Sequence, residues 1–371
     1  MKTSMVAKIV AVMVLLVSFS PAIARAEEDR PLVQIAILLD TSGSMSGLIN
    51  QAKTQLWQIV NQFALAKKHG KQPLLQVGLY EYGNDGLPAR DSWMRQILPL
   101  TDDLDKVSEK LFALTTNGGS EYCGMVIQKA VRGLAWSASN EVYKAIFIAG
   151  NEPFTQGPVD YRIACKEAVS KGIVVNTIHC AGASDDGWKD GAIVADGSFS
   201  KIDSNQTVVD IAAPQDKALS NLNTELNKTY VAYGAEGATR KALQEAQDTN
   251  AAAASGNIAS RAYSKAQGYY KNTSWDLVDA VKNDAVKIGD LKEEELPPEM
   301  RGMSEDKRVE YVNKVAAQRT EIQARINTLM TERSAYVETE TRKRSAEDKS
   351  LGSAVMSTVR AQAEKSNFTF E

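Results

Sequence analysis

Three polar residues at alternate positions follow an apolar run in this chain. Asp40, Ser42 and Ser44 come directly after residues 32–39. One carboxylate and two hydroxyls are hard oxygen ligands of the kind that Mg²⁺, Mn²⁺ or Ca²⁺ prefer, and Gly43 lets the backbone curl so that short side chains can face one point. The pattern indicates a divalent-cation site. The same letters would also suit a strand followed by an ordinary Ser/Gly turn, with Asp40 capping the next helix.

The elements around this motif indicate a strand-to-helix connection in a parallel sheet. Residues 32–39 are too apolar for a surface strand. After the motif, apolar residues recur at helical spacing: Leu48, Ala52, Leu56, Ile59, Val60 and Phe63. In doubly wound α/β folds, ligands bind outside the carboxyl ends of the strands, which is where this motif would lie.

Strands and helices alternate along the next part of the chain. Strands are expected over 74–80, 95–100, 143–149, 173–178 and 198–202, and helices over 103–114, 125–134, 161–170 and 188–195. Pro99 marks 95–100 as an edge strand. The order predicts an α/β fold with a doubly wound, mainly parallel sheet that helices cover on both faces.

The segment LLDTSGSMSG, residues 38–47, resembles the metal-ion-dependent adhesion site of the von Willebrand factor type A domain, the fold shared with integrin I domains. The resemblance extends over about residues 33–230. It implies that two further loops complete the site, one with a Thr after a Gly-rich turn and one with an Asp after a buried strand. Ser120 falls at the first of these places, so the implied metal ligands are Asp40, Ser42, Ser44 and Ser120.

The third loop departs from the family's pattern, because Gly150 stands where the Asp is usual. Glu121, Asn151 or Glu152 could partly replace the missing carboxylate. With one fewer anion, the site should bind its ion weakly and depend on water or on a partner's carboxylate. An acid restored at position 150 is expected to raise the affinity for the ion. A vestigial site is the open alternative.

The N-terminus has the features of a secretory signal peptide over residues 1–26. Lys2 and Lys8 precede an apolar run from 9 to 19, and Ala24-Arg25-Ala26 matches the pattern that signal peptidase cuts. The apolar run is shorter than the roughly 20 residues that span a bilayer. We therefore expect a mature protein that begins at Glu27, does not span the membrane, and is periplasmic or secreted.

Composition argues against several other classes of protein and site. The net charge is −3, with 43 basic and 46 acidic residues, so nothing indicates nucleic-acid binding. With two histidines in the chain, a zinc site of Cys/His type has few candidate ligands. In an oxidising compartment two of the cysteines Cys123, Cys165 and Cys180 would pair. The expected pair is Cys165 with Cys180.

Length favours two domains, predicted here as a type A domain over 27–235 and a helical domain over 236–371. In the second, 242–270 is helix-prone with an interruption near 255–257. Ser274 is the expected N-cap of a helix over 275–287, and Ser304 of a longer helix. No structure is assigned to 366–371.

The long helix after Ser304 carries a heptad seam of residues spaced by three and four: Val312, Val315, Arg319, Ile322, Ile326, Leu329, Arg333 and Tyr336. Arg319 and Arg333 occupy "a" positions. They favour an intramolecular hairpin packed on the preceding helices, with the arginine stems covering apolar surface, and hence a monomer. A dimer through this seam is the competing interpretation.

These features together predict an exported binding protein. A divalent cation, Mg²⁺ first and Mn²⁺ or Ca²⁺ otherwise, would help it recognise an extracytoplasmic protein or glycan that presents a carboxylate. The alternative is an envelope structural or assembly scaffold that acts through its helical domain and has a vestigial metal site. A metal-dependent hydrolase using Asp40 or Glu152 is disfavoured, because HExxH, GxSxG and SxxK motifs with suitable partners are missing. No catalytic residue is predicted.

Overall fold

The computed structural model describes residues 30–180, 185, 187–203, 205, 210–253, 255–343 and 351–370. The predicted signal peptide, residues 1–26, lies outside the described residues. None of the helices in this described part combines the length and the apolar character that crossing a membrane requires.

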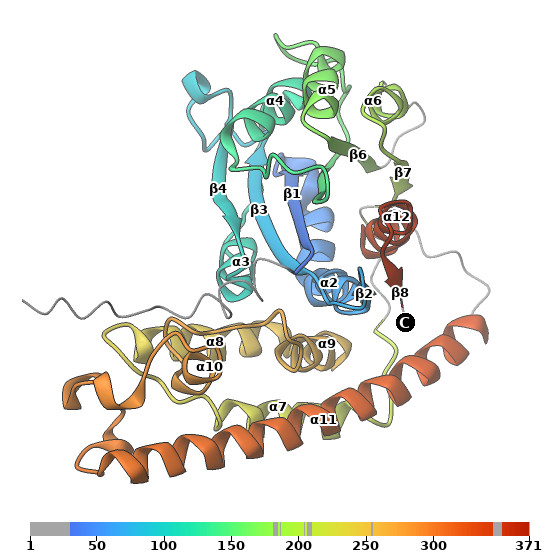
Figure 1. Cartoon of the computed structure of the whole chain (residues 1–371). Coiled ribbons are helices and arrows are strands. Elements are labelled where there is room, and N and C mark those ends of the chain that lie inside the picture. Colours follow the sequence, from blue (N-terminus) through green and yellow to red (C-terminus); the bar gives the residue numbers. More distant parts are fainter. Residues whose placement is uncertain are drawn as a thin grey trace, which may run out of the picture. The chain divides into compact units, whose positions relative to one another are not determined.

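A six-stranded sheet in the order β4-β3-β1-β5-β6-β7 forms the centre of the α/β part (Figure 1). Its strands are β1 Leu32–Asp40, β3 Leu74–Tyr82, β4 Met94–Thr101, β5 Tyr143–Gly150, β6 Ile173–Cys180 and β7 Phe199–Ile202. Within this sheet β4 pairs antiparallel with β3, and the other four strand pairs are parallel. The predicted mainly parallel sheet is confirmed, with the strand that contains Pro99 at an edge.

Helices cover the sheet on both faces because successive strand residues point to opposite sides. In β1, Ile35 and Leu39 pack with α2 (Ser46–Ala64) and α3 (Leu104–Phe112). Ala36 and Leu38 belong to the core on the other face, which is built with α4 (Cys123–Gly133), α5 (Tyr161–Ser170) and α6 (Trp188–Val194). This arrangement confirms the doubly wound fold.

The expected disulfide between Cys165 and Cys180 is wrong. Both cysteines are free and buried, as is Cys123. Cys165 lies in the core that α4 and α5 build, whereas Cys180, at the end of β6, points into the core on the opposite face of the sheet. The sheet itself separates the two thiols.

The helical part contains α7 Asp216–Asn227, α8 Gly237–Ala251, α9 Ser255–Lys265, α10 Leu277–Lys282, α11 Glu305–Lys343 and α12 Leu351–Lys365. The interruption predicted near 255–257 comes slightly earlier, since α8 ends at Ala251 and residues 255–257 already form the first turn of α9. The helix α11 starts directly after Ser304, as predicted. The prediction for 275–287 was wrong in its details. Its helix, α10, is shorter and is capped by Asp276, whose carboxylate accepts a hydrogen bond from the Asp279 N–H at 3.0 Å. The first residues of the predicted helix instead form a turn, in which the Asp276 N–H donates a hydrogen bond to the Asn272 carbonyl.

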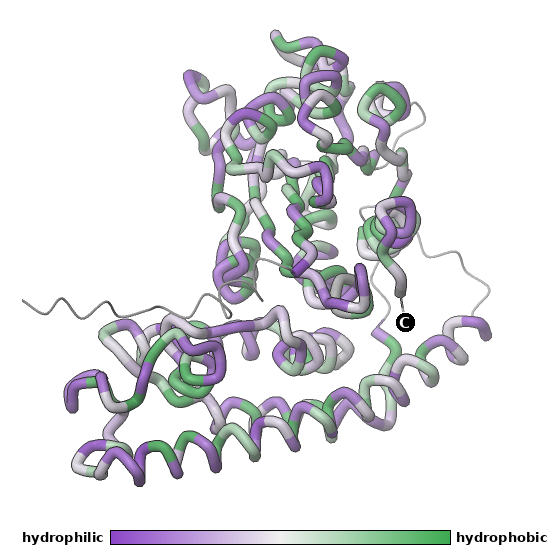
Figure 2. The backbone as a smooth tube through the Cα atoms, viewed as in Figure 1, coloured by the Kyte–Doolittle hydropathy of each residue, from purple (hydrophilic) through white to green (hydrophobic). Residues whose placement is uncertain are grey.

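The seam of α11 packs within the same chain, on α7, α9 and α10. Along α11, hydrophilic and hydrophobic residues alternate (Figure 2). Arg319 and Arg333 are buried as part of that seam, and each meets an acid. Arg319 Nη1 lies 2.6 Å from an Asp276 carboxylate oxygen, and Arg333 Nε lies 2.6 Å from Asp216. The hairpin-like packing is as expected, but the arginines form buried ion pairs in addition to covering apolar surface.

The C-terminal helix α12 returns to the α/β part and lies against α2, β6 and β7. Its Gln362 accepts a hydrogen bond from the Tyr143 hydroxyl at 2.7 Å and donates one to Asn176 at 2.6 Å. After α12, β8 (Thr369–Phe370) pairs antiparallel with β2 (Ala66–Lys67), which gives structure to the unassigned tail.

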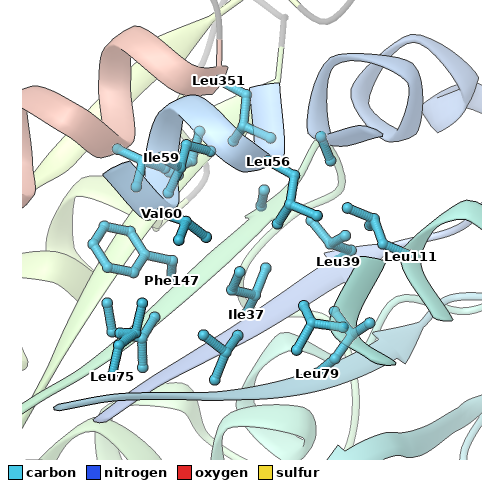
Figure 3. Close-up of a pocket in the computed structure, with 17 residues that line it drawn as sticks. Ile37, Leu39, Leu56, Ile59, Val60, Leu75, Leu79, Leu111, Phe147 and Leu351 are labelled. Atoms are coloured by element: carbon cyan, nitrogen blue, oxygen red, sulfur yellow. The ribbon is translucent and has the colours of Figure 1, made fainter. Parts of the chain in front are cut away.

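An apolar cavity of about 50 Å³ lies between the sheet and the helices that cover it (Figure 3). Leu351 of α12 lines it together with Leu56 and Ile59 of α2 and Ile37 of β1. The ranges 27–235 and 236–371 therefore share one hydrophobic core, and the boundary between them as separate domains stays a prediction.

Candidate functional site

The ends of β1, β3 and β5 bring three loops together at one edge of the sheet. Asp40 is the last residue of β1 and pairs with Tyr82, the last residue of β3. The N–H of Asn117 donates to the carbonyl of Thr41 at 3.0 Å, which joins the loop before α4 to the motif. From the loop after β5, Asn151 Nδ2 donates to Ser44 Oγ at 3.1 Å. The structure thus brings together the three loops that the resemblance implies.

Asp40 is fully buried, and its two carboxyl oxygens differ in their hydrogen bonds. Oδ1 accepts a hydrogen bond from the Ser42 N–H at 2.8 Å. Oδ2 accepts no hydrogen bond of ordinary length from the described residues. Burial raises the pKa of the Asp40 carboxyl to about 7. The nearby N–H groups of Ser42 and Asn151 lower this pKa in part, and the negative charge of Glu152 raises it further. The carboxylate is therefore costly to ionise unless a cation balances it.

The two motif hydroxyls lie beside this carboxyl group. Ser42 Oγ and Ser44 Oγ are 3.3 Å apart. Ser42 precedes the short 3₁₀ turn Gly43–Met45, Ser44 lies within it, and Met45 is buried. Ser120, the hydroxyl predicted from the second loop, is half-buried near the start of α4. Within the described part of the chain it makes no hydrogen bond to the motif, so its role as a ligand stays a prediction.

Glu121 is the acid that comes closest to Asp40 from the second loop. A Cβ atom on Gly83, which has a φ of +76°, would lie 2.7 Å from Glu121 Cγ and 2.9 Å from Asp40 Oδ1. Burial, followed by the negative charges of Asp40 and Glu152, raises the pKa of the Glu121 carboxyl to about 7. From the sequence, Glu121 is only one of three residues that could partly replace the missing carboxylate of the third loop. It could not be preferred over the other two, because its approach to Asp40 depends on Gly83 in a different loop.

Tyr82 is a residue of the site that sequence reasoning missed. It is fully buried, and its hydroxyl donates to the Ala149 carbonyl at 3.0 Å. The same hydroxyl fills the space beside Gly150, where a Cβ atom would also be 3.0 Å from Asp40 Oδ2. In the sequence, the packing of Tyr82 against residue 150 was indicated only by Gly150, which stands where the type A family usually has Asp.

The donor set fits a hard divalent cation. Besides Asp40 Oδ2, Asn151 Oδ1 is buried and without a hydrogen-bond partner among the described residues. Asp40, Ser42 and Ser44 are the motif side chains that would hold the ion, and Glu121 and Asn151 lie beside them. In the same described part, no group of three His, Cys, Asp or Glu side chains is placed to hold a metal. An ion here would therefore depend on hydroxyls and water in addition to carboxylates.

A match to a protein-family model agrees with the fold. Residues 34–198 match the family model described as von Willebrand factor type A domain. Among solved structures, the chain is similar to the conserved hypothetical protein BatB from Bacteroides thetaiotaomicron, at 18% identity over 46% of this chain and 90% of that chain, with a TM-score of 0.34. It is also similar to a von Willebrand factor type A protein from Catenulispora acidiphila, at 14% identity over 47% of this chain and 39% of that chain, with a TM-score of 0.36. A search of curated proteins found no match.

Proposed function

Because residues 34–198 form a von Willebrand factor type A domain, we propose that this is an exported binding protein whose Asp40 site holds a divalent cation and uses it to recognise a partner. The observation that carries the proposal is the buried Asp40 carboxylate, one oxygen of which accepts no hydrogen bond of ordinary length from the described residues, next to the motif residues Ser42 and Ser44. Buried polar atoms are otherwise almost always satisfied. A cation is the ligand that would satisfy this one.

The ion supplies a positive charge that can bind one more oxygen. Mg²⁺ is the first candidate, with Mn²⁺ or Ca²⁺ as alternatives, since all three take oxygen ligands. The chain contributes fewer side chains than a shell of six or more oxygens needs, so the remaining places go to water or to the partner. An extracytoplasmic protein or glycan that presents a carboxylate would suit such a place. We propose a binding role and no catalytic one.

A second candidate function rests on the helical part. The 39-residue helix α11 is fixed to α7 and α10 by the buried pairs of Arg333 and Arg319, which makes it a stiff and elongated element. A structural or assembly scaffold could act through its charged outer face. In that case binding would not need the cation.

The proposal includes export. The Lys-flanked apolar run and Ala24-Arg25-Ala26 support cleavage after residue 26. N-terminal sequencing of the native protein should then read from Glu27. A retained Met1 would contradict export by this route.

Partner capture from an envelope extract tests the function. The mature protein should retain a partner in Mg²⁺ and release it in EDTA, and Asp40→Ala should fail to retain it in either buffer. Asp102→Ala, which removes an exposed acid, is the matched control and should behave as wild type. Binding that is indifferent to chelator and to Asp40→Ala would favour the scaffold function.

A further inference from the structure

We infer that Glu121 is the second anionic ligand of the cation at the Asp40 site, in place of the third-loop aspartate that Gly150 replaces. The inference rests on the proposed function, since it concerns the same ion. It differs from the expected ligand set, in which the second loop supplies only the hydroxyl of Ser120. In this ligand set the second negative charge of the site comes from the loop before α4 and not from the loop after β5.

The backbone fixes the direction of Glu121. Its N–H donates to Gln156 Oε1 at 2.6 Å, and the N–H of Asn117, four residues earlier, is bonded to the Thr41 carbonyl. The side chain of Glu121 packs beside Gly83, where a Cβ atom would lie 2.7 Å from Glu121 Cγ and 2.9 Å from Asp40 Oδ1. Only a residue without a side chain at 83 allows this approach. Glu121 of the second loop and the Asp40 carboxyl group thus lie next to the same point beside Gly83.

The third loop has no room for an equivalent acid at position 150. The Tyr82 hydroxyl occupies the space into which a side chain there would extend. Glu152 is the next acid along that loop. Its backbone carbonyl accepts a hydrogen bond from Trp188 Nε1 at 2.8 Å, and its side chain is half-exposed, whereas Glu121 is only 6% exposed.

The charge balance at the site points to the same ligand. Asp40 and Glu121 are both buried, and within the described part of the chain neither forms an ion pair with a Lys or Arg side chain. Buried carboxylates are rare unless they are paired or bind a metal. Asp40 Oδ2 is a fully buried oxygen that has no partner in that part of the chain. One divalent cation would balance both acids, so the ion should bind before any partner is present.

Titration of the full-length mature protein with Mn²⁺ at pH 8, read from the EPR signal of free Mn²⁺, tests the inference. Glu121→Gln should weaken Mn²⁺ binding at least about tenfold, because affinity in such sites follows the number of charged ligands. Glu152→Gln, which removes a neighbouring acid, should change it less than about threefold. Glu121→Asp keeps the charge on a shorter side chain and should fall between Glu121→Gln and wild type. Urea unfolding without metal confirms that each variant is folded.

Three outcomes would overturn the inference. If Glu121→Gln binds Mn²⁺ as wild type does while Asp40→Ala does not bind it, Glu121 is not a ligand but the proposed function stands. If Glu121→Gln and Glu152→Gln weaken binding equally, Glu121 acts only through the overall charge of the site. If Asp40→Ala also binds Mn²⁺ as wild type does, the cation site itself is wrong and the proposed function fails with it.

Discussion

The hydroxyl of Tyr82 lies where the side chain of residue 150 would begin, so Tyr82 and Gly150 fill one space between them. The Tyr82 hydroxyl is held there by its hydrogen bond to the Ala149 carbonyl at 3.0 Å. Gly150 is not among the residues with positive φ. Close packing against Tyr82, and not backbone conformation, is therefore what requires glycine at this position. Because of this packing we now expect that an acid at position 150 would not improve the site, contrary to the expectation from the sequence.

Gly150→Asp should destabilise the protein by about 1–3 kcal/mol, as overpacking of a filled site usually does. It should not raise the affinity for Mg²⁺. Gly150→Ala should be destabilising as well, and adding Tyr82→Phe should recover part of that loss, because the two side chains compete for one space. Urea unfolding of the two single variants and the double variant measures the coupling. Strictly additive effects, or tighter Mg²⁺ binding by Gly150→Asp, would contradict this account.

The stability of the metal-free protein should depend on the ionisation of Asp40. Burial raises the pKa of Asp40 from its ordinary 3.8 to about 7, so between these values the folded state holds a proton that the unfolded state has lost. The contribution of Asp40 to the free energy of unfolding therefore falls as the pH rises from about 4 to 7, and it stays constant above pH 7.

Asp40→Asn removes this penalty. In EDTA it should be more stable than wild type at pH 8, by roughly 1–4 kcal/mol, since one pKa unit corresponds to about 1.4 kcal/mol. The difference should shrink toward pH 4. Saturating Mg²⁺ should stabilise wild type at pH 8 and leave Asp40→Asn nearly unchanged. Thermal unfolding across this pH range is the measurement, and a difference that does not vary with pH would show that Asp40 is not protonated in the fold.

The fold and the first part of the site could be predicted because their signals are local. The run 32–39 followed by Asp40, Ser42 and Ser44 lies within thirteen consecutive residues, and the structure keeps it as a strand and a turn. The role of Glu121 could not be ranked from the sequence. It depends on Gly83, 38 positions away, and no spacing rule relates the two loops.

The errors have a similar origin in tertiary packing. Whether Cys165 and Cys180 face each other depends on which side of the sheet each points to, and a shift of one residue along a strand reverses that side. The return of α12 to the sheet was not predicted either, because an apolar helix face does not identify the surface it covers. The seam on α11 was predicted from its spacing, but the acids that meet Arg319 and Arg333 come from distant segments.

The buried pair between Arg319 and Asp276 should contribute strongly to the stability of the helical part. Arg319→Ala would leave Asp276, which is fully buried, without its cation and should cost about 3–5 kcal/mol. Arg325→Ala, on the same helix, removes an exposed arginine 3.9 Å from Glu225 and should change stability by less than about 0.5 kcal/mol. Urea unfolding compares the two variants. Equal effects would mean that the buried pair is not formed.

The packing of α12 should stabilise the α/β part. Leu351→Ala enlarges a cavity that already exists under this helix, so it should cost about 2–5 kcal/mol. Ser357→Ala on the exposed side of α12 is the control and should be nearly neutral. The fragment 27–235, which lacks α12, should unfold at lower urea than the full chain. A fragment as stable as the full chain would show that the helix adds nothing to that core.

The presence of a cation at Asp40 is the central claim, and anomalous diffraction from crystals grown or soaked in Mn²⁺ tests it most directly. The account predicts a peak about 2.0–2.6 Å from an Asp40 carboxylate oxygen, in contact with the hydroxyls of Ser42 and Ser44. The peak should be absent from crystals of Asp40→Ala treated in the same way. Well-ordered wild-type crystals in saturating Mn²⁺ with no peak beside Asp40 would contradict the account.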